Sequence, residues 1–206
     1  LDKLEEKKIT DNTIVIFFSD NGGVEWYNFS DNGILRGIKG DFFEGGIRVP
    51  FTMQWPKKIK SGTTYDKPII ALDVFATVAS AASAEKYIKN DIDGVDLLPY
   101  ITGKKSGLPH KYLYWKNPDK DIDVVRDERY KYIRIKDDEY IFDLKNDISE
   151  ETNIIDSSKP IYDRLKSQFK EWEKEMIDPV FLDLGSGKEY NKLNPDRWFN
   201  SSQEKQ

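Results

Sequence analysis

The most constraining feature of this sequence is a run of β-branched and aromatic residues, 13–18, followed directly by a polar segment, 19–46. Such a short run is typical of a strand that is buried on both faces in a parallel α/β sheet. The polar segment contains seven glycines, and loops of this length inside compact domains usually serve a function. The pattern therefore predicts a ligand-binding loop at the carboxyl end of a parallel strand.

The first half of the chain shows two further elements. Residues 49–55 predict a second short strand, which ends at Pro56. Asp73 is a candidate N-cap for a helix over residues 74–83. The core-facing side of that helix is predicted from its apolar residues, which are Val74, Phe75, Val78, Ala81 and Ala82.

After Pro99 the pattern changes to short segments rich in Tyr, Ile and Val, separated by turn residues. This pattern is typical of an antiparallel meander. The predicted strands are residues 112–115, 123–126, 130–135 and 139–144, and a helix is predicted over residues 159–176. We expect an α/β fold with a first domain at 1–99, a small α+β subdomain at 100–185 with an antiparallel sheet and one C-terminal helix, and a tail at 186–206.

Composition excludes several classes of function. A net charge of −5 and a pI near 5.1 argue against a nucleic-acid partner, which needs a basic face. No apolar segment approaches the length that spans a bilayer, so no membrane partner is expected. The absence of cysteine excludes disulfides and a thiolate nucleophile within this chain. His110 is the single histidine, which argues against a polyhistidine metal site, and its place before a strand favours a structural role.

Asp20, Asn21 and Lys39 are the candidate site residues. Asp20 and Asn21 offer a carboxylate and an amide oxygen at the end of the first strand, and these hard ligands suit Ca²⁺ or Mg²⁺. Lys39 lies between Gly37 and Gly40, where its ammonium group could bind a phosphate or sulfate oxygen. The alternative is ordinary turn chemistry with a solvated lysine.

Three neighbouring features of the loop bear on the same question. A second Ser-Asp-Asn-Gly at residues 30–33 is interpreted as a turn that positions residues 35–40. Glu44 and Arg48 are predicted to form an ion pair that fixes the loop rather than an acid/base pair. Arg36 could serve in either of these two roles. The aromatic residues of the loop, which are Trp26, Tyr27 and Phe29, could stack on a sugar ring, although packing beneath the loop is the favoured interpretation.

An ordered set of motifs resembles the second half of the sulfatase family, within the alkaline-phosphatase-like superfamily. The set begins with Ser-Asp-Asn-Gly at 19–22, Leu-Arg-Gly-Ile-Lys-Gly at 35–40 and Glu-Gly-Gly-Ile-Arg-Val-Pro at 44–50. It continues with Asp-Gly-Val-Asp-Leu-Leu-Pro at 93–99, with residues 129–132 and 140–144, and with Asp147, Glu150 and Asn153. The resemblance covers most of the chain and implies a partial alkaline-phosphatase-like sheet.

The resemblance also implies a set of roles. Asp20 and Asn21 would ligate a divalent cation, usually Ca²⁺, and Lys39 would contact the sulfate. The family's Cys- or Ser-x-Pro-Ser-Arg segment, which supplies the formylglycine nucleophile, is absent, and so are its paired N-terminal aspartates. We therefore expect the C-terminal portion of a longer sulfatase, inactive by itself, whose partner is the missing N-terminal half of the same protein.

The substrate is expected to be a sulfate-ester small molecule or a sulfated carbohydrate. The sequence leaves the compartment open, and a periplasmic or secreted full-length parent is compatible with it. Two alternatives remain at this point: a phosphatase or phosphonate hydrolase of the same superfamily, and a non-catalytic packing or binding domain. If the sheet of the parent protein continues upstream, the first strand has an exposed edge in this chain. Self-association of the chain is then expected.

Overall fold

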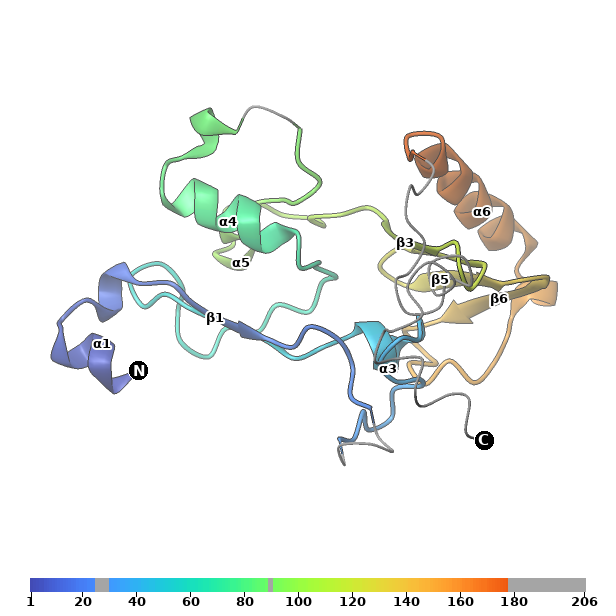
Figure 1. The fold of residues 1–206 in the computed structure, drawn as a ribbon, viewed down its shortest axis with the longest axis horizontal. Coiled ribbons are helices and arrows are strands. Elements are labelled where there is room, and N and C mark those ends of the chain that lie inside the picture. The colour runs from blue at the N-terminus through green and yellow to red at the C-terminus, as the bar shows by residue number, and fades with distance from the viewer. Residues whose placement is uncertain (25–29, 89–90, 178–206) are drawn as a thin grey trace, which may run out of the picture. The chain divides into compact units, whose positions relative to one another are not determined.

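The computed structural model describes residues 1–24, 30–88 and 91–177 (Figure 1). The chain divides into two compact units. Unit 1 comprises Leu1–Leu113 with Ile148–Glu150, and unit 2 comprises Tyr114–Asp147 with Glu151–Gln206. The predicted tail, 186–206, and the three aromatic residues of the loop lie outside the described residues. Within the described part of the chain, no helix combines the length and the apolar character that crossing a membrane requires.

Unit 1 contains short elements joined by long connections. In chain order they are α1 (Asp2–Glu6), a 3-10 turn (Thr10–Asn12), β1 (Val15–Phe18), α3 (Glu44–Ile47), β2 (Phe51–Gln54), α4 (Asp73–Ala81), a second 3-10 turn (Glu85–Tyr87) and α5 (Leu98–Ile101). The predicted strands at 13–18 and 49–55 are thus confirmed, with bounds a few residues shorter. The described residues of the segment, 19–24 and 30–46, form a loop as predicted, except that the loop runs into a helical turn at Glu44.

The predicted parallel pairing of the first strand is wrong for the described residues. β1 pairs with β2 in the antiparallel direction, with Val15 opposite Gln54 and Phe18 opposite Phe51. Nor is β1 covered on both faces, because the Phe17 side chain is 72% exposed. The sequence pattern reports how apolar a strand is, whereas the direction of pairing depends on the neighbour that the chain brings beside it.

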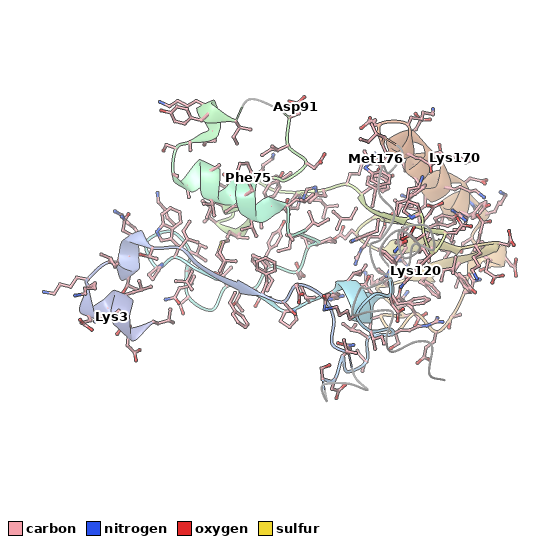
Figure 2. All side chains as sticks on the ribbon, viewed as in Figure 1. Lys3, Phe75, Asp91, Lys120, Lys170 and Met176 are labelled. Carbon is pink, nitrogen blue, oxygen red and sulfur yellow. The ribbon has the colours of Figure 1, made fainter. Side chains whose placement is uncertain are left out.

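Two predictions for α4 are also wrong. Asp73 is the first residue of the helix rather than its N-cap. The buried residues of the helix are Asp73, Ala76 and Thr77. The predicted core face is instead open to solvent, with Phe75 60% exposed (Figure 2) and Val78 45% exposed. Asp73 is buried because its carboxylate accepts hydrogen bonds from the backbone N–H groups of Ile70 and Val95. Hydrogen bonds to Asp73, including one from a residue 22 positions away, therefore accompany the choice of which side of the helix faces inward.

Unit 2 is a four-stranded antiparallel meander with one helix, as predicted. The strands follow one another in the order β3 (Leu113–Asn117), β4 (Ile122–Arg126), β5 (Tyr130–Ile135) and β6 (Asp138–Asp143). α6 (Lys159–Glu173) packs against β4 and β5 (Figure 1). Its buried residues, Leu165 and Phe169, lie four apart and so share one face of the helix.

The core of unit 2 is apolar and closely packed. Its fully buried members lie on β4, β5, β6 and α6, and they include Val124, Val125, Ile133, Ile141 and Leu165. Tyr114 of β3 stacks on Trp172 of α6, with ring centroids 4.9 Å apart. Burial of apolar side chains on this scale is the main stabilising contribution to a unit of this size.

A polar cluster joins the sheet of unit 2 to α6. The Glu139 carboxylate accepts hydrogen bonds from the Tyr132 hydroxyl at 2.5 Å, the Tyr162 hydroxyl at 2.8 Å and the Lys166 ammonium at 2.7 Å. Burial opposes ionisation of Glu139, but these hydrogen bonds outweigh it and lower the pKa of Glu139 to about 2. The carboxylate is therefore ionised at neutral pH and links β5, β6 and α6.

Candidate functional site

Asp20 and Asn21 directly follow β1 in unit 1. The Ser19 N–H donates to the Pro50 carbonyl at 3.3 Å, which extends the β1–β2 pairing by one residue. The Asn21 N–H donates to Asp20 Oδ1 at 3.0 Å, and Asn21 Nδ2 donates to the Gly22 carbonyl at 2.9 Å. The Asp20 side chain is exposed, and Asn21 is half-buried. The strand therefore ends in a local turn that presents a carboxylate to solvent.

Gly22 and Gly23 connect this turn to the loop that carries Lys39. The Gly22 N–H donates to the Gly46 carbonyl at 2.9 Å, and the Lys39 N–H donates to the Gly23 carbonyl at 3.1 Å. A Cβ at position 22 would lie 1.7 Å from the Gly45 carbonyl oxygen, so only glycine permits this approach. The two parts of the predicted site are thus held together by backbone hydrogen bonds within one unit.

The second Ser-Asp-Asn-Gly segment, residues 30–33, helps to position the loop that carries Lys39, as its interpretation as a turn predicted. Asn32 Oδ1 accepts the Gly23 N–H at 2.8 Å, and Asn32 Nδ2 donates to the carbonyls of Gly23 at 3.2 Å and Gly37 at 3.0 Å. The Asp31 carboxylate accepts the Gly33 N–H at 2.7 Å. One asparagine side chain therefore connects the segment after β1 to the residues that precede Lys39.

Lys39 lies on the exposed part of this loop. The glycines on either side have φ values of +88° at Gly37 and +91° at Gly40, a region that side chains with a Cβ rarely adopt. The backbone of Lys39 is held by its hydrogen bond to Gly23. The ammonium group extends from this anchored backbone and can be directed at an anion.

Glu44 and Arg48 form the predicted ion pair, with 3.7 Å between Arg48 Nη1 and Glu44 Oε2. Glu44 is fully buried at the first residue of α3, while Arg48 is exposed. Arg36, whose role the sequence left open, has its guanidinium 4.0 Å from the centroid of the Phe43 ring. Arg36 therefore packs within the loop rather than extending toward a ligand.

Sequence analysis missed Glu150 as a member of this part of the structure. Its carboxylate accepts the Glu44 N–H at 2.6 Å, and its backbone carbonyl accepts a hydrogen bond from Arg36 at 2.8 Å. Glu150 is 106 residues from Glu44 in sequence and fully buried. In the sequence, Glu150 belongs to the motif that follows the last strand. That motif indicated a family but did not indicate which residues Glu150 contacts.

His110 pairs with Asp73 rather than with Asp20, Asn21 or Lys39, in agreement with the structural role that the sequence favoured. Its Nε2 is 2.7 Å from Asp73 Oδ1, at the start of α4. The Asp73 carboxylate is buried, and the His110 side chain is 12% exposed. The pair therefore connects the segment before β3 to α4.

The donor atoms near Asp20 fit only part of a cation shell. Among the residues that the structure describes, no group of three or more His, Cys, Asp or Glu side chains could hold a metal ion. Asp20 offers a carboxylate, and Asn21 can offer its amide oxygen, because its nitrogen is used by the Gly22 carbonyl. These oxygen donors match a hard cation such as Ca²⁺, whose shell takes six to eight oxygens. The chemistry of the pair fits Ca²⁺, and the number of ligands is incomplete.

Comparison with solved structures defines the fold class. The crystal structure of Ps i-CgsB superimposes with a TM-score of 0.78 at 26% sequence identity, covering 98% of this chain and 45% of that protein. The same protein in complex with k-i-k-neocarrahexaose gives a TM-score of 0.77 at 25% identity. The protein has the alkaline-phosphatase-like α/β fold of the sulfatases that it resembles.

Comparison of sequences then identifies the family. Residues 39–176 match the family described as N-sulphoglucosamine sulphohydrolase, C-terminal. The uncharacterized sulfatase YdeN of Escherichia coli is 37% identical over 147 residues, which are 68% of this chain and 26% of that protein. Human steryl-sulfatase is 37% identical over 121 residues, which are 55% of this chain and 21% of that protein. The chain belongs to the sulfatase family and spans about a quarter of the length of these relatives.

Proposed function

We propose that the full-length protein hydrolyses sulfate esters and that this chain supplies one side of its active site. In this proposal Asp20 and Asn21 are ligands of a divalent cation, and Lys39 binds the sulfate. The observation that carries it is the pair of hydrogen bonds from Lys39 to Gly23 and from Gly22 to Gly46, which hold the two motifs together. The formylglycine nucleophile lies outside this chain, so we expect the chain alone to be inactive.

The proposed roles follow from charge. A sulfate ester carries a negative charge that shifts toward the leaving oxygen as the S–O bond breaks, and fixed positive charge nearby lowers the energy of that transition state. Lys39 supplies an ammonium point charge, and its exposed position leaves the approach of an anion open. A bound cation, with Ca²⁺ as the proposed ion, would act as a Lewis acid on a sulfate oxygen. Asp20 would hold that cation with its carboxylate.

The proposed substrate class is a sulfated carbohydrate or a smaller sulfate ester. Support comes from the structural neighbour in complex with k-i-k-neocarrahexaose, an oligosaccharide.

The substrate preference of the full-length protein tests this function. We expect purified full-length protein, matured with its nucleophile, to hydrolyse p-nitrophenyl sulfate at least a hundredfold faster than p-nitrophenyl phosphate, because the whole site is then built for a singly charged ester. Steady-state kcat/KM for the two esters gives the ratio, and metal analysis gives the bound cation. A preference for the phosphate ester would replace the proposal by phosphatase activity, and turnover of neither ester would favour a binding domain.

We also propose that the remaining part of the catalytic domain covers the apolar residues that unit 1 exposes. Large exposed apolar side chains occur on β1 at Phe17 and along one side of α4 at Leu72, Phe75 and Val78. Leu72, the N-cap of α4, and Phe75 and Val78 within α4 lie three apart in sequence and so share a face. Apolar side chains grouped on one face commonly mark an interaction surface.

The isolated 206-residue chain should therefore self-associate. We expect its sedimentation coefficient to increase with concentration between about 5 and 200 μM, since burial of apolar surface is favourable. Phe75→Ser should weaken this association, whereas Tyr87→Ser, a change at another exposed aromatic residue of unit 1, should leave it intact. A monomer over the whole concentration range would contradict the proposed surface.

A further inference from the structure

Glu150 makes two contacts with the lysine loop, which we define as residues 35–48. Its Oε2 accepts the backbone N–H of Glu44 at 2.6 Å, so it satisfies a donor at the first residue of α3. Its backbone carbonyl accepts a hydrogen bond from the Arg36 guanidinium at 2.8 Å. Glu150 therefore contacts the loop at two residues, one on each side of Lys39 in sequence.

The backbone at Glu150 is in a conformation that glutamate rarely adopts. Its φ is +54°, in the left-handed region. Four other described residues that are not glycine also have a positive φ, and all four are exposed: Lys8, Ser83, Asp121 and Lys136. Glu150 alone among the five is buried. Such a conformation costs about 1 kcal/mol or more and persists where surrounding contacts hold it, commonly at functional sites.

Two groups of contacts shape the loop on either side of Lys39. The Arg36 guanidinium packs on the Phe43 ring, and the Arg36 carbonyl accepts the Gly45 N–H at 2.6 Å. These contacts close the loop at its base. Further along, Asp41 closes a turn with Ile38: its N–H donates to the Ile38 carbonyl at 2.9 Å, and its carboxylate accepts the Ile38 N–H at 3.0 Å.

We propose that Glu150 is a positioning residue for Lys39. By fixing Arg36 and Glu44, it sets the base of the lysine loop, and the loop in turn fixes the place from which the Lys39 ammonium reaches the sulfate. This inference rests on the proposed function of Lys39. A displacement of about 1 Å of a charged group that stabilises a transition state can lower a rate about a hundredfold, so a buried residue that touches no substrate can affect turnover.

Activity of the full-length protein gives the first test. We expect Glu150→Ala to lower kcat/KM for p-nitrophenyl sulfate about ten- to a hundredfold, and Glu150→Gln to retain activity within about threefold, because its amide oxygen still accepts the Glu44 N–H. Glu151→Ala is the matched control: it removes the exposed neighbouring glutamate and should leave kcat/KM unchanged. Near-normal turnover by folded Glu150→Ala protein would overturn the proposal.

A double-mutant cycle separates positioning from general stability. If Glu150 acts through Lys39, Glu150→Ala should lower kcat/KM by less than twofold further once Lys39 is alanine. If Glu150→Ala lowers kcat/KM by the same factor with Lys39 present and with Lys39→Ala, Glu150 affects only the fraction of protein that is folded. Near-ultraviolet circular dichroism of each variant gives that population independently.

Hydrogen exchange in the 206-residue chain distinguishes failure of this inference from failure of the proposed function. We expect peptides covering residues 36–46 to exchange at least tenfold faster in Glu150→Ala and unchanged in Glu151→Ala. If Lys39→Ala alone has normal activity, the assigned role of Lys39 fails, while faster exchange still identifies Glu150 as the residue that holds the loop. Unchanged exchange in Glu150→Ala overturns the inference whatever the activity shows.

Discussion

Replacing Lys39 with alanine in the full-length protein should lower kcat/KM for a sulfate ester by about two to three orders of magnitude. The expected size comes from the loss of one preorganised positive group at a site where negative charge develops. The loop itself should remain folded, because the hydrogen bond to Gly23 uses the Lys39 backbone and is independent of the side chain. The loss should therefore appear in turnover with the melting temperature nearly unchanged.

The same measurement on Asp20 tests the other side of the proposed site. Asp20→Ala should lower activity by a similar factor and also reduce the bound calcium measured by metal analysis, because a carboxylate ligand is lost. Lys57→Ala, an exposed lysine in the same unit, serves as the control for loss of a surface charge. Near-normal turnover in both Lys39→Ala and Asp20→Ala would exclude the assigned roles.

Replacing Glu139 with glutamine should destabilise unit 2 by about 1–2 kcal/mol at pH 7, after allowance for the solvent that screens this partly exposed group. Glutamine can still accept hydrogen bonds from the hydroxyls of Tyr132 and Tyr162, but it loses the charge that pairs with Lys166. Hydrogen exchange of the β5 amides reports on this unit by itself. Asp138→Asn, at the exposed neighbouring residue of β6, is the control.

The pH dependence of this effect has a definite sign. The pKa of Glu139 is about 2 in the folded protein, below its ordinary value of 4.5. A carboxylate with a lowered folded pKa contributes stability above about pH 4.5, and that contribution is lost as the pH falls toward 2. The difference between the native protein and Glu139→Gln should therefore shrink over this range. A difference that stays constant down to pH 2 would contradict the assigned ion pair.

Much of unit 2 could be predicted from its sequence because its stabilising contacts are local. Consecutive strands pair with their neighbours, so alternation of apolar residues and short turns is enough to indicate the order β3 to β6. The helix of unit 2 was likewise predicted, and its buried residues Leu165 and Phe169 lie four apart, which is the spacing of one helix face. α6 packs on the sheet through the face that carries Leu165 and Phe169, because that face holds its apolar residues.

Unit 1 was predicted less well because its arrangement depends on contacts between distant residues. The face of α4 was assigned from apolar spacing, yet Asp73 is buried by hydrogen bonds to Ile70, Val95 and His110, and Phe75 is left exposed. A hydrophobic pattern marks a surface that tends to be covered, without identifying what covers it. β1 shows the same limit, because its apolar character led to a prediction of parallel pairing, whereas its neighbour β2 is antiparallel.

The sequence alone indicated the family, the residues proposed for the candidate site and the glycines around Lys39, since these are properties of residue type and order. Only the tertiary structure showed that Asn32 joins the two motifs and that Glu150 holds the base of the lysine loop. Both depend on hydrogen bonds with exact geometry between segments that are separated in sequence, up to 114 residues for Arg36 and Glu150. No local pattern of residues encodes such a pairing.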